Sequence, residues 1–229
     1  MKYLILSFLL AVNARADLKA FECKKALSVD KADQILSEVQ TKYSGLKSFQ
    51  ARFIQYSFLA ALETSELSSG IMSFEKPGKM RWVYEEPEAQ EFTADGKSLW
   101  FYQPTDNQVL IDSFKTAFQS DLPVSFLMGI GDLRKNFSLK QGCSNQDGTL
   151  LSFLPKDRVK TDELSFFTLM VSSDSFLPIG AEITDVAGNK NSFLFNEMKP
   201  NVELASANFS PTFPKGTDVI DRRSESSNP

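Results

Sequence analysis

Apolar residues alternate with polar ones through most of this chain, and this alternation limits its fold more than any other feature. In one segment Phe49, Ala51 and Phe53 alternate with Gln50 and Arg52. The period of two recurs in residues 70–74, 80–85, 91–93, 99–102, 137–140, 149–154, 164–171, 179–184 and 192–195. Side chains with this period point to opposite faces of a strand, so the pattern predicts a sheet with one buried face. A hairpin turn at Asp95-Gly96 favours antiparallel order.

A helix is predicted in front of these strands, over residues 28–43. Its apolar side chains have the spacing of one helical stripe and are Ala32, Ile35, Leu36, Val39 and Tyr43. Ser28 or Asp30 can cap its start, and Gly45 can end it.

A second, shorter helix is predicted after Asp121-Leu122-Pro123, because Pro suits the first turn of a helix. The stretch that follows is apolar on nearly every side and ends near Gly129 and Gly131. Such a helix must lie against another apolar surface. About ten strands without an internal repeat can curl into a barrel or an open half-barrel, so we expect one domain of residues 17–229 with a flexible tail at 222–229.

Residues 1–16 are typical of a secretory signal peptide, with Lys2, a short apolar run and Ala14-Arg15-Ala16 as the cleavage site. A membrane anchor is the alternative, but the run is about half the roughly 20 residues that span a bilayer. We therefore expect an exported protein that begins at Asp17. Loss of Lys2 and Arg15 would take the net charge from −4 to −6, which disfavours nucleic acid as a partner.

The two cysteines, Cys23 and Cys143, would meet an oxidising compartment after export. One disulfide is then possible, and it would tie the N-terminal segment to the sheet. Two unpaired thiols are the alternative.

The chain has no His, which excludes Ser-His-Asp and Cys-His nucleophiles and His-bearing metal sites. Pairs of Ser and Lys occur without the other elements of an acyl-enzyme site, and the carboxylates around Pro87 and at 162–163 are typical of solvated turns. No phosphate-binding or dinucleotide motif is present. We expect no catalytic residue, metal or cofactor, with an enzyme that uses carboxylates as a minor hypothesis.

The 20 Phe residues need another explanation. The simpler one is that they fill a core. The other is that a curled sheet and a short apolar helix enclose a cavity for a ligand such as an acyl chain, which gains about 0.8 kcal/mol for each CH₂ removed from water.

Five strings of residues, in order along the chain, resemble motifs of the outer-membrane lipoprotein carrier family, LolA. The strings are Phe49-Gln50-Ala51-Arg52-Phe53-Ile54-Gln55, the hairpin at 70–82, the run from Ala94 to Pro104, Pro123 to Met128, and the ending from Ala207 to Val219. The second resembles G-x-L-x-x-x-R-P-x-x-x-x-W, and the third resembles D-G-K-x-L-W-x-Y-x-P. The five strings lie between residues 49 and 219, and the resemblance as a whole runs from about residue 33 to 220.

The resemblance implies an α+β fold, an unclosed antiparallel β-barrel of ten to eleven strands with an α-helical lid over an apolar cavity. It also implies a periplasmic chaperone, acting as a monomer, that receives lipoproteins from an inner-membrane ABC transporter and delivers them to an outer-membrane acceptor. A LolA-like sensor or regulatory domain that binds lipid without delivering cargo is the alternative.

Under this resemblance the acyl-chain cavity is lined by apolar residues of both the strands and the lid. The candidates are Phe53, Met72, Phe74, Trp82, Leu99, Phe101, Phe126, Leu127 and Ile130. Met80 is a candidate partner contact. The family has Arg before the hairpin Pro, where it bonds to the lid, whereas this chain has Lys76. Because Lys lacks the planar fork of donors, we expect weaker closure of the lid. Either the lid closes differently, with Arg81 in this role, or the protein is a divergent member of the family with another lipid cargo.

Overall fold

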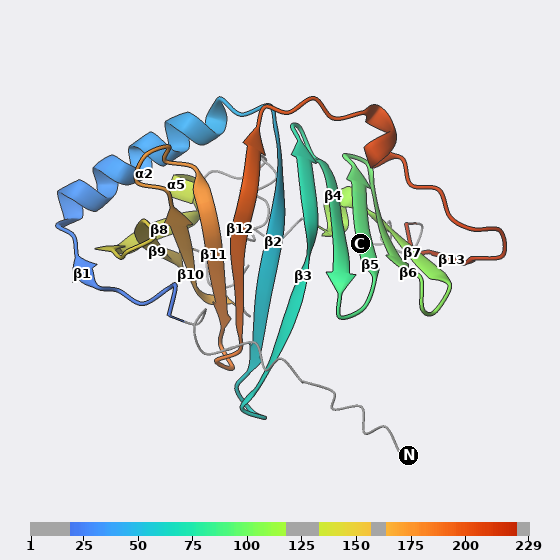
Figure 1. Ribbon diagram of the computed structural model, residues 1–229, viewed down its shortest axis with the longest axis horizontal. Coiled ribbons are helices and arrows are strands. Elements are labelled where there is room, and N and C mark those ends of the chain that lie inside the picture. The colour runs from blue at the N-terminus through green and yellow to red at the C-terminus, as the bar shows by residue number, and fades with distance from the viewer. Residues whose placement is uncertain (1–18, 118–132, 157–163, 224–229) are drawn as a thin grey trace, which may run out of the picture.

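The computed structural model describes residues 19–117, 133–156 and 164–223, and the strands in these ranges form one sheet of thirteen (Figure 1). Their order across the sheet is β1-β8-β9-β10-β11-β12-β2-β3-β4-β5-β6-β7-β13. The end strands, β1 and β13, are not paired with each other, so the sheet is open. The predicted unclosed antiparallel sheet is confirmed, whereas the expectation of ten to eleven strands was too low.

The strands have the following bounds: β1 Lys25–Ala26, β2 Ser48–Leu59, β3 Thr64–Glu75, β4 Lys79–Glu86, β5 Gln90–Asp95, β6 Ser98–Gln103, β7 Gln108–Ser113, β8 Phe137–Ser144, β9 Thr149–Pro155, β10 Leu164–Val171, β11 Pro178–Asp185, β12 Lys190–Pro200 and β13 Asp218–Asp221. The helical elements of the described residues are α2 Val29–Ser44, α3 Phe114–Ala117, α5 Leu133–Asn136 and the 3-10 turn η1 Ser206–Phe209. All strand pairs are antiparallel except β13, which runs parallel to β7.

The long helix α2 forms where the apolar stripe predicted it. Ser28 caps its first turn by accepting a hydrogen bond from the backbone N–H of Lys31, and Gly45 follows its last residue. Its buried side chains are those of the predicted stripe, Ala32, Ile35, Leu36, Val39 and Tyr43. They belong to the main hydrophobic core together with residues of β2 to β5 and β8 to β12.

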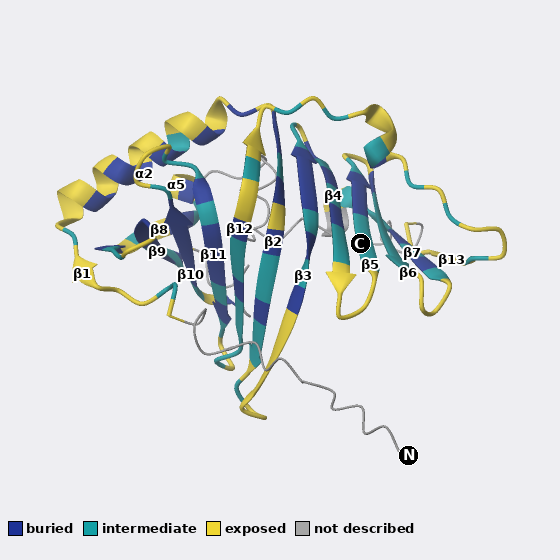
Figure 2. Ribbon diagram, viewed as in Figure 1, coloured by how far each residue is buried: buried dark blue, intermediate teal, exposed yellow. Residues whose placement is uncertain are grey.

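We call the face of the sheet that contributes to this core the inner face, and the opposite one the outer face. On β2 the residues Phe49, Ala51 and Phe53 belong to the core, while the side chain of Arg52 between them is exposed. Figure 2 shows the same change between buried and less buried positions along neighbouring strands. The alternation read from the sequence therefore assigns the inner face correctly over β2 and β4.

Close approach of β3 to β4 requires a glycine at position 70. A Cβ built there would lie 1.9 Å from the carbonyl oxygen of Val83, well inside any allowed contact. Gly70 also pairs with Phe53 of β2, so the missing side chain leaves room beside that ring. Its place next to a register shift between β3 and β4 fits the role of glycine at irregular points of a sheet.

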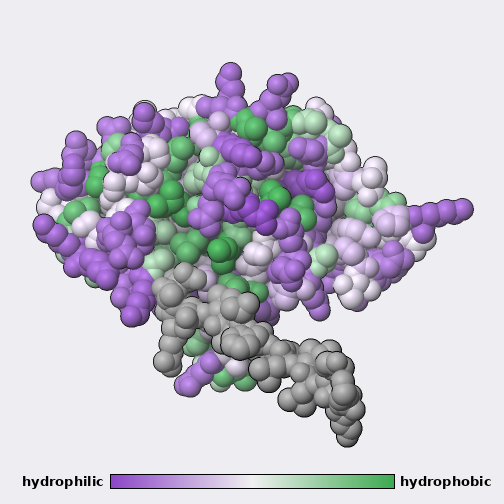
Figure 3. All heavy atoms as spheres, in the orientation of Figure 1, coloured by the Kyte–Doolittle hydropathy of each residue, from purple (hydrophilic) through white to green (hydrophobic). Residues whose placement is uncertain are grey.

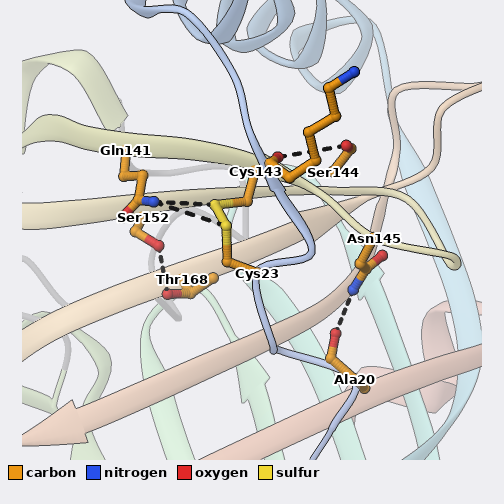
Figure 4. The surroundings of a disulfide bond; sticks show 9 residues. Ala20, Cys23, Gln141, Cys143, Ser144, Asn145, Ser152 and Thr168 are labelled. Atoms are coloured by element: carbon orange, nitrogen blue, oxygen red, sulfur yellow. Dashed lines mark hydrogen bonds between the residues drawn. A yellow bond between two sulfur atoms is a disulfide. The ribbon is translucent and has the colours of Figure 1, made fainter.

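A disulfide between Cys23 and Cys143 fastens the N-terminal segment to β8 (Figure 4). The same segment is held by the side-chain amide of Asn145, which donates to the carbonyl of Ala20 at 2.6 Å. Cys143 belongs to a small outer-face cluster that also includes Phe21 and Met170. The segment thus covers part of the outer face, away from the main core.

The C-terminal segment covers another part of the outer face. Phe209 of η1 is 1% exposed, and the ring of Phe213 lies 5.1 Å from that of Tyr102. Beyond β13, Arg222 and Arg223 form ion pairs with Asp112 and Asp221. Both residues, the first two of the expected flexible tail, also make hydrogen bonds to the sheet.

Three parts of the sequence interpretation lie outside the described residues. They are the signal peptide at 1–16, the lid helix expected after Asp121, and the end of the tail from residue 224.

Candidate functional site

Six aromatic side chains form a continuous layer on the inner face, which we call the aromatic wall. They come from β2, β4, β5, β6 and β12 and are Phe53, Trp82, Tyr84, Phe92, Phe101 and Phe193. Each ring centroid lies 4.3 to 6.4 Å from another, beginning with 5.2 Å between Phe53 and Trp82 and ending with 4.3 Å between Phe92 and Phe101. Stacked and edge-to-face rings at such distances attract one another beyond simple burial.

The six predicted cavity residues that lie on strands share this inner face. Phe53, Met72, Phe74 and Trp82 are at most 6% exposed, so their own packing fills the space between them. The other two, Leu99 and Phe101, are half-buried on β6. The structure therefore brings these residues into one surface at the centre of the sheet. Phe126, Leu127 and Ile130 were expected to complete it from the lid and lie outside the described residues.

Three members of the aromatic wall were not among the predicted site residues: Tyr84, Phe92 and Phe193. The period of two contained the signal for each of them. Tyr84 stands two residues after Trp82, and Phe92 pairs with Trp82 across β4 and β5. Phe193 stands two residues before Phe195, which pairs with Phe53. Extending the inner-face register along each strand would have found all three.

An open cavity of about 570 Å³ adjoins the aromatic wall. It is lined by Gln55, Ser57, Glu66, Ser68, Tyr84, Pro87, Glu88, Gln90 and Phe92. One side is thus aromatic, through Tyr84 and Phe92, and the other side carries hydroxyl, amide and carboxylate groups. No Lys or Arg is among these lining residues, so the cavity does not favour an anionic ligand.

A hydrogen-bond network fixes the polar side of this cavity. The hydroxyl of Tyr84 donates to Oε1 of Gln55 at 2.7 Å, and the amide of Gln55 donates to Oδ1 of Asn191 at 3.0 Å. Burial raises the pKa of Tyr84 to about 12, which keeps its phenol neutral at physiological pH. The inner face therefore changes from an apolar centre to a polar, hydrogen-bonded rim at this end.

Lys76, the predicted lid latch, bonds to α2. Its Nζ donates to the backbone carbonyl of Tyr43 and lies 4.3 Å from the centre of the Tyr43 ring. Burial lowers the pKa of Lys76. A cation at the last turn of a helix also offsets the partial negative charge there. The side chain thus fastens the C-terminal end of α2 to the β3–β4 hairpin.

The two neighbours of Lys76 that were given roles lie on different faces. Arg81 is part of the outer face, where its guanidinium forms two hydrogen bonds with Glu91 of β5, at 3.0 and 2.9 Å. Met80 is 4% exposed and belongs to the inner-face core. A partner could touch Met80 only after this face is uncovered.

Within the described ranges, no helix is long and apolar enough to cross a membrane. No cluster of three or more Cys, Asp or Glu side chains suited to a metal ion occurs there either. In the orientation of Figure 3, green apolar areas are interrupted by purple polar and charged groups. This mixture is usual for a surface in contact with water.

Residues 44–212 match the family model described as "Outer membrane lipoprotein carrier protein LolA". These residues include strands β2 to β12, and so every member of the aromatic wall.

Two curated relatives are each called "Outer-membrane lipoprotein carrier protein". The protein of Cupriavidus taiwanensis is 31% identical over 212 residues, which is 91% of this chain and 96% of the relative. The protein of Nitrosospira multiformis is 34% identical over 189 residues, 79% of this chain and 88% of the relative.

Among solved structures, an uncharacterised conserved protein from Thermus thermophilus has a similar fold. The TM-score is 0.53 at 17% sequence identity, and the match covers 84% of this chain and 99% of that one. At this level of identity the likeness concerns the fold alone.

Proposed function

The chain belongs to the LolA family of outer membrane lipoprotein carrier proteins, and on that premise we propose that it carries lipoproteins across the periplasm with their acyl chains covered. The aromatic wall is the observation that carries this proposal. It gives the inner face a broad apolar surface that offers no directional partner along most of its area. Acyl chains suit such a surface, because each CH₂ gains about 0.8 kcal/mol on leaving water and needs no hydrogen bond.

The proposed acyl site consists of the predicted residues of the inner face. Its strand members are Phe53, Met72, Phe74, Trp82, Leu99 and Phe101, and its lid members are Phe126, Leu127 and Ile130. In the structure the first four pack against one another, so an incoming chain must replace packing that the protein already has. This exchange lowers the affinity for cargo, because the loss of internal packing offsets part of the free energy gained by burying the acyl chain. A modest hold suits a carrier that must release what it binds.

The cavity beside Tyr84 and Phe92 is the proposed entrance to this site. It is open at one end of the inner face and already has one aromatic side. An acyl chain that lies along this side reaches Phe101, whose ring stacks on Phe92. The polar rim would then face the part of the lipoprotein at which the chains join the protein.

We further propose that an inner-membrane ABC transporter loads the carrier and that a separate outer-membrane acceptor unloads it, with the carrier acting as a monomer. The names of the relatives support a lipoprotein cargo and an outer-membrane destination. A carrier needs no catalytic group, cofactor or metal for this task, and both exchanges would take place at the same inner face.

A transfer assay tests the proposed function. Inner-membrane vesicles that contain the transporter and a labelled lipoprotein are incubated with the purified mature protein, with and without ATP. We expect soluble lipoprotein bound to the carrier only when both carrier and ATP are present. Recovery of free lipid alone, or of no lipid, would contradict the carrier function.

Lys76 is the proposed latch of this site, and its contact with α2 gives a specific prediction. Lys76→Glu removes the bond to the Tyr43 carbonyl and places a negative charge near the C-terminal end of α2. We expect the free energy of unfolding to fall by about 1–3 kcal/mol, with the fold retained, and cargo loading or release to be impaired. Urea unfolding and the transfer assay measure the two effects.

Lys76→Arg is the matched control, because it keeps a positive charge and a donor at this position. It should retain most of the stability and transfer activity. Transfer at the wild-type rate by Lys76→Glu would show that this side chain is not a latch.

A further inference from the structure

Trp82 contains a polar group that the packing of the inner face leaves unused. The side chain is 6% exposed, and its indole Nε1 is buried without an acceptor among the described residues. The rings of Phe53, Phe74 and Phe193 surround it, with centroids at 5.2, 6.1 and 5.4 Å. None of these rings contains an oxygen or nitrogen atom that could accept a hydrogen bond.

The hydroxyl of Tyr84, two residues further along β4, does not accept a hydrogen bond from the indole N–H of Trp82. Tyr84 stacks on Trp82 with a centroid distance of 6.4 Å, and its hydroxyl is directed to Gln55 as a donor. A buried donor without an acceptor destabilises a protein, and a Phe in place of Trp82 would provide an aromatic ring without that penalty. The N–H therefore contributes nothing to the core that a Phe could not supply, and this points to an acceptor that arrives with a ligand.

We propose that the indole N–H of Trp82 donates a hydrogen bond to a carbonyl oxygen at the head of a bound acyl chain. This inference rests on the proposed carrier function and adds a fixed polar point to an otherwise apolar site. The ester or amide carbonyl is the polar atom that every protein-linked acyl chain brings, and it is neutral like the donor. In a medium of low dielectric constant such a bond is stronger than in water.

A carbonyl that comes from the open cavity must displace some of the ring packing around Trp82, because Nε1 is buried. Tyr84 and Phe92 both line that cavity. Tyr84 is two residues after Trp82 on β4, and Phe92 of β5 is the residue that pairs with Trp82. A chain that enters along these two rings meets the indole next. One bond at this depth would set how far each chain slides into the site, so that its methyl end extends toward Met72 and Phe74.

The test compares Trp82→Phe with the wild type, using lauric acid methyl ester and dodecane as probes. The two probes are similar in length, but only the ester has a carbonyl. We expect Trp82→Phe to speed release of the ester roughly five- to tenfold more than release of dodecane, because both probes lose the same apolar contact but only the ester loses a neutral hydrogen bond. The unfolding midpoint of Trp82→Phe in urea shows the balance between the unpaired donor that is removed and the cavity that the smaller ring leaves.

Trp100→Phe is the matched control. Trp100 pairs with Ile111 on the outer face, so its replacement should alter neither release rate. In this background Trp82 is the one remaining Trp, and its indole N–H resonance should shift downfield with the ester but not with dodecane. This second measurement does not depend on how well Trp82→Phe folds.

The outcomes separate the two proposals. Equal loss of ester and dodecane by Trp82→Phe, or an indole resonance that responds to both probes alike, would overturn the hydrogen bond while leaving the carrier function intact. Failure of the wild type to bind either probe would overturn the acyl site itself.

Discussion

Replacing both Cys23 and Cys143 by Ser is expected to lower the free energy of unfolding by about 4–5 kcal/mol. The disulfide closes a loop with a sequence separation of 120 residues, and in the chain-entropy model a long loop gives a large stabilisation. For a domain of this size the midpoint of thermal unfolding should fall by roughly 10–15 °C. Thermal unfolding followed by circular dichroism measures the change.

The loss should begin at one edge of the sheet. β1 contains two residues and pairs with β8 at Ser144 and Cys143 alone. Once the disulfide is gone, the segment before α2 is held by a few hydrogen bonds, such as that from the Leu27 N–H to the Gly142 carbonyl. Limited proteolysis should therefore cut this segment first.

Wild-type protein in reductant is the control for this prediction, because it loses the same bond without a substitution. Its midpoint should approach that of the double variant, and the double variant should not respond to reductant. An unchanged midpoint of the wild type in reductant would contradict the stabilising role.

The second large effect is expected from Phe101→Asp, which places a charge in the proposed acyl site. Phe101 is half-buried at the end of the aromatic wall and stacks on Phe92 at 4.3 Å, so the cost to the free energy of unfolding should be limited to about 1–2 kcal/mol. An acyl chain, however, would have to cover a carboxylate. We expect cargo affinity to fall at least about 100-fold, since a buried unpaired charge is strongly unfavourable.

Phe58→Asp is the matched control for this variant. Phe58 is also half-buried, but its side chain belongs to the outer face of β2. Both variants should be measured in the transfer assay with their unfolding curves. If Phe101→Asp accepts lipoprotein as well as Phe58→Asp does, the aromatic wall is not the acyl site.

The sequence was a good guide wherever burial is one-sided. Helix α2 begins and ends beside the predicted caps Ser28 and Gly45, and the inner-face positions of β2 and β4 follow the alternation. In such elements each residue faces either the core or water, so the period of the pattern shows both the type of element and its buried face.

The three strands that were missed lack that one-sidedness. On β7, Val109 and Ile111 are buried on the outer face while Leu110 between them is half-buried on the inner face, so apolar residues follow one another without a polar residue between them. On β13 every residue is exposed, and its partner β7 lies about 110 residues earlier in the chain. β1 is too short to show a period.

Only part of the site could be predicted from the sequence, and the reason is related. The lining of the inner face follows from residue type and register, which sequence contains. The contact of Lys76 does not, because its acceptor is the backbone carbonyl of Tyr43, 33 residues away, and any residue type offers such a carbonyl. The lack of a partner for Nε1 of Trp82 could not be predicted either, because it depends on the three-dimensional surroundings of the ring.

The two free ends of the sheet affect how the carrier can respond to the size of its cargo. In a closed barrel the number of strands, their tilt and their stagger fix the radius. A sheet that ends at β1 on one side and β13 on the other is under no such constraint, so its curvature can relax by small changes of twist shared among many strands. We therefore expect the sheet to widen around bulkier lipids by small changes of twist, without separation of its paired strands.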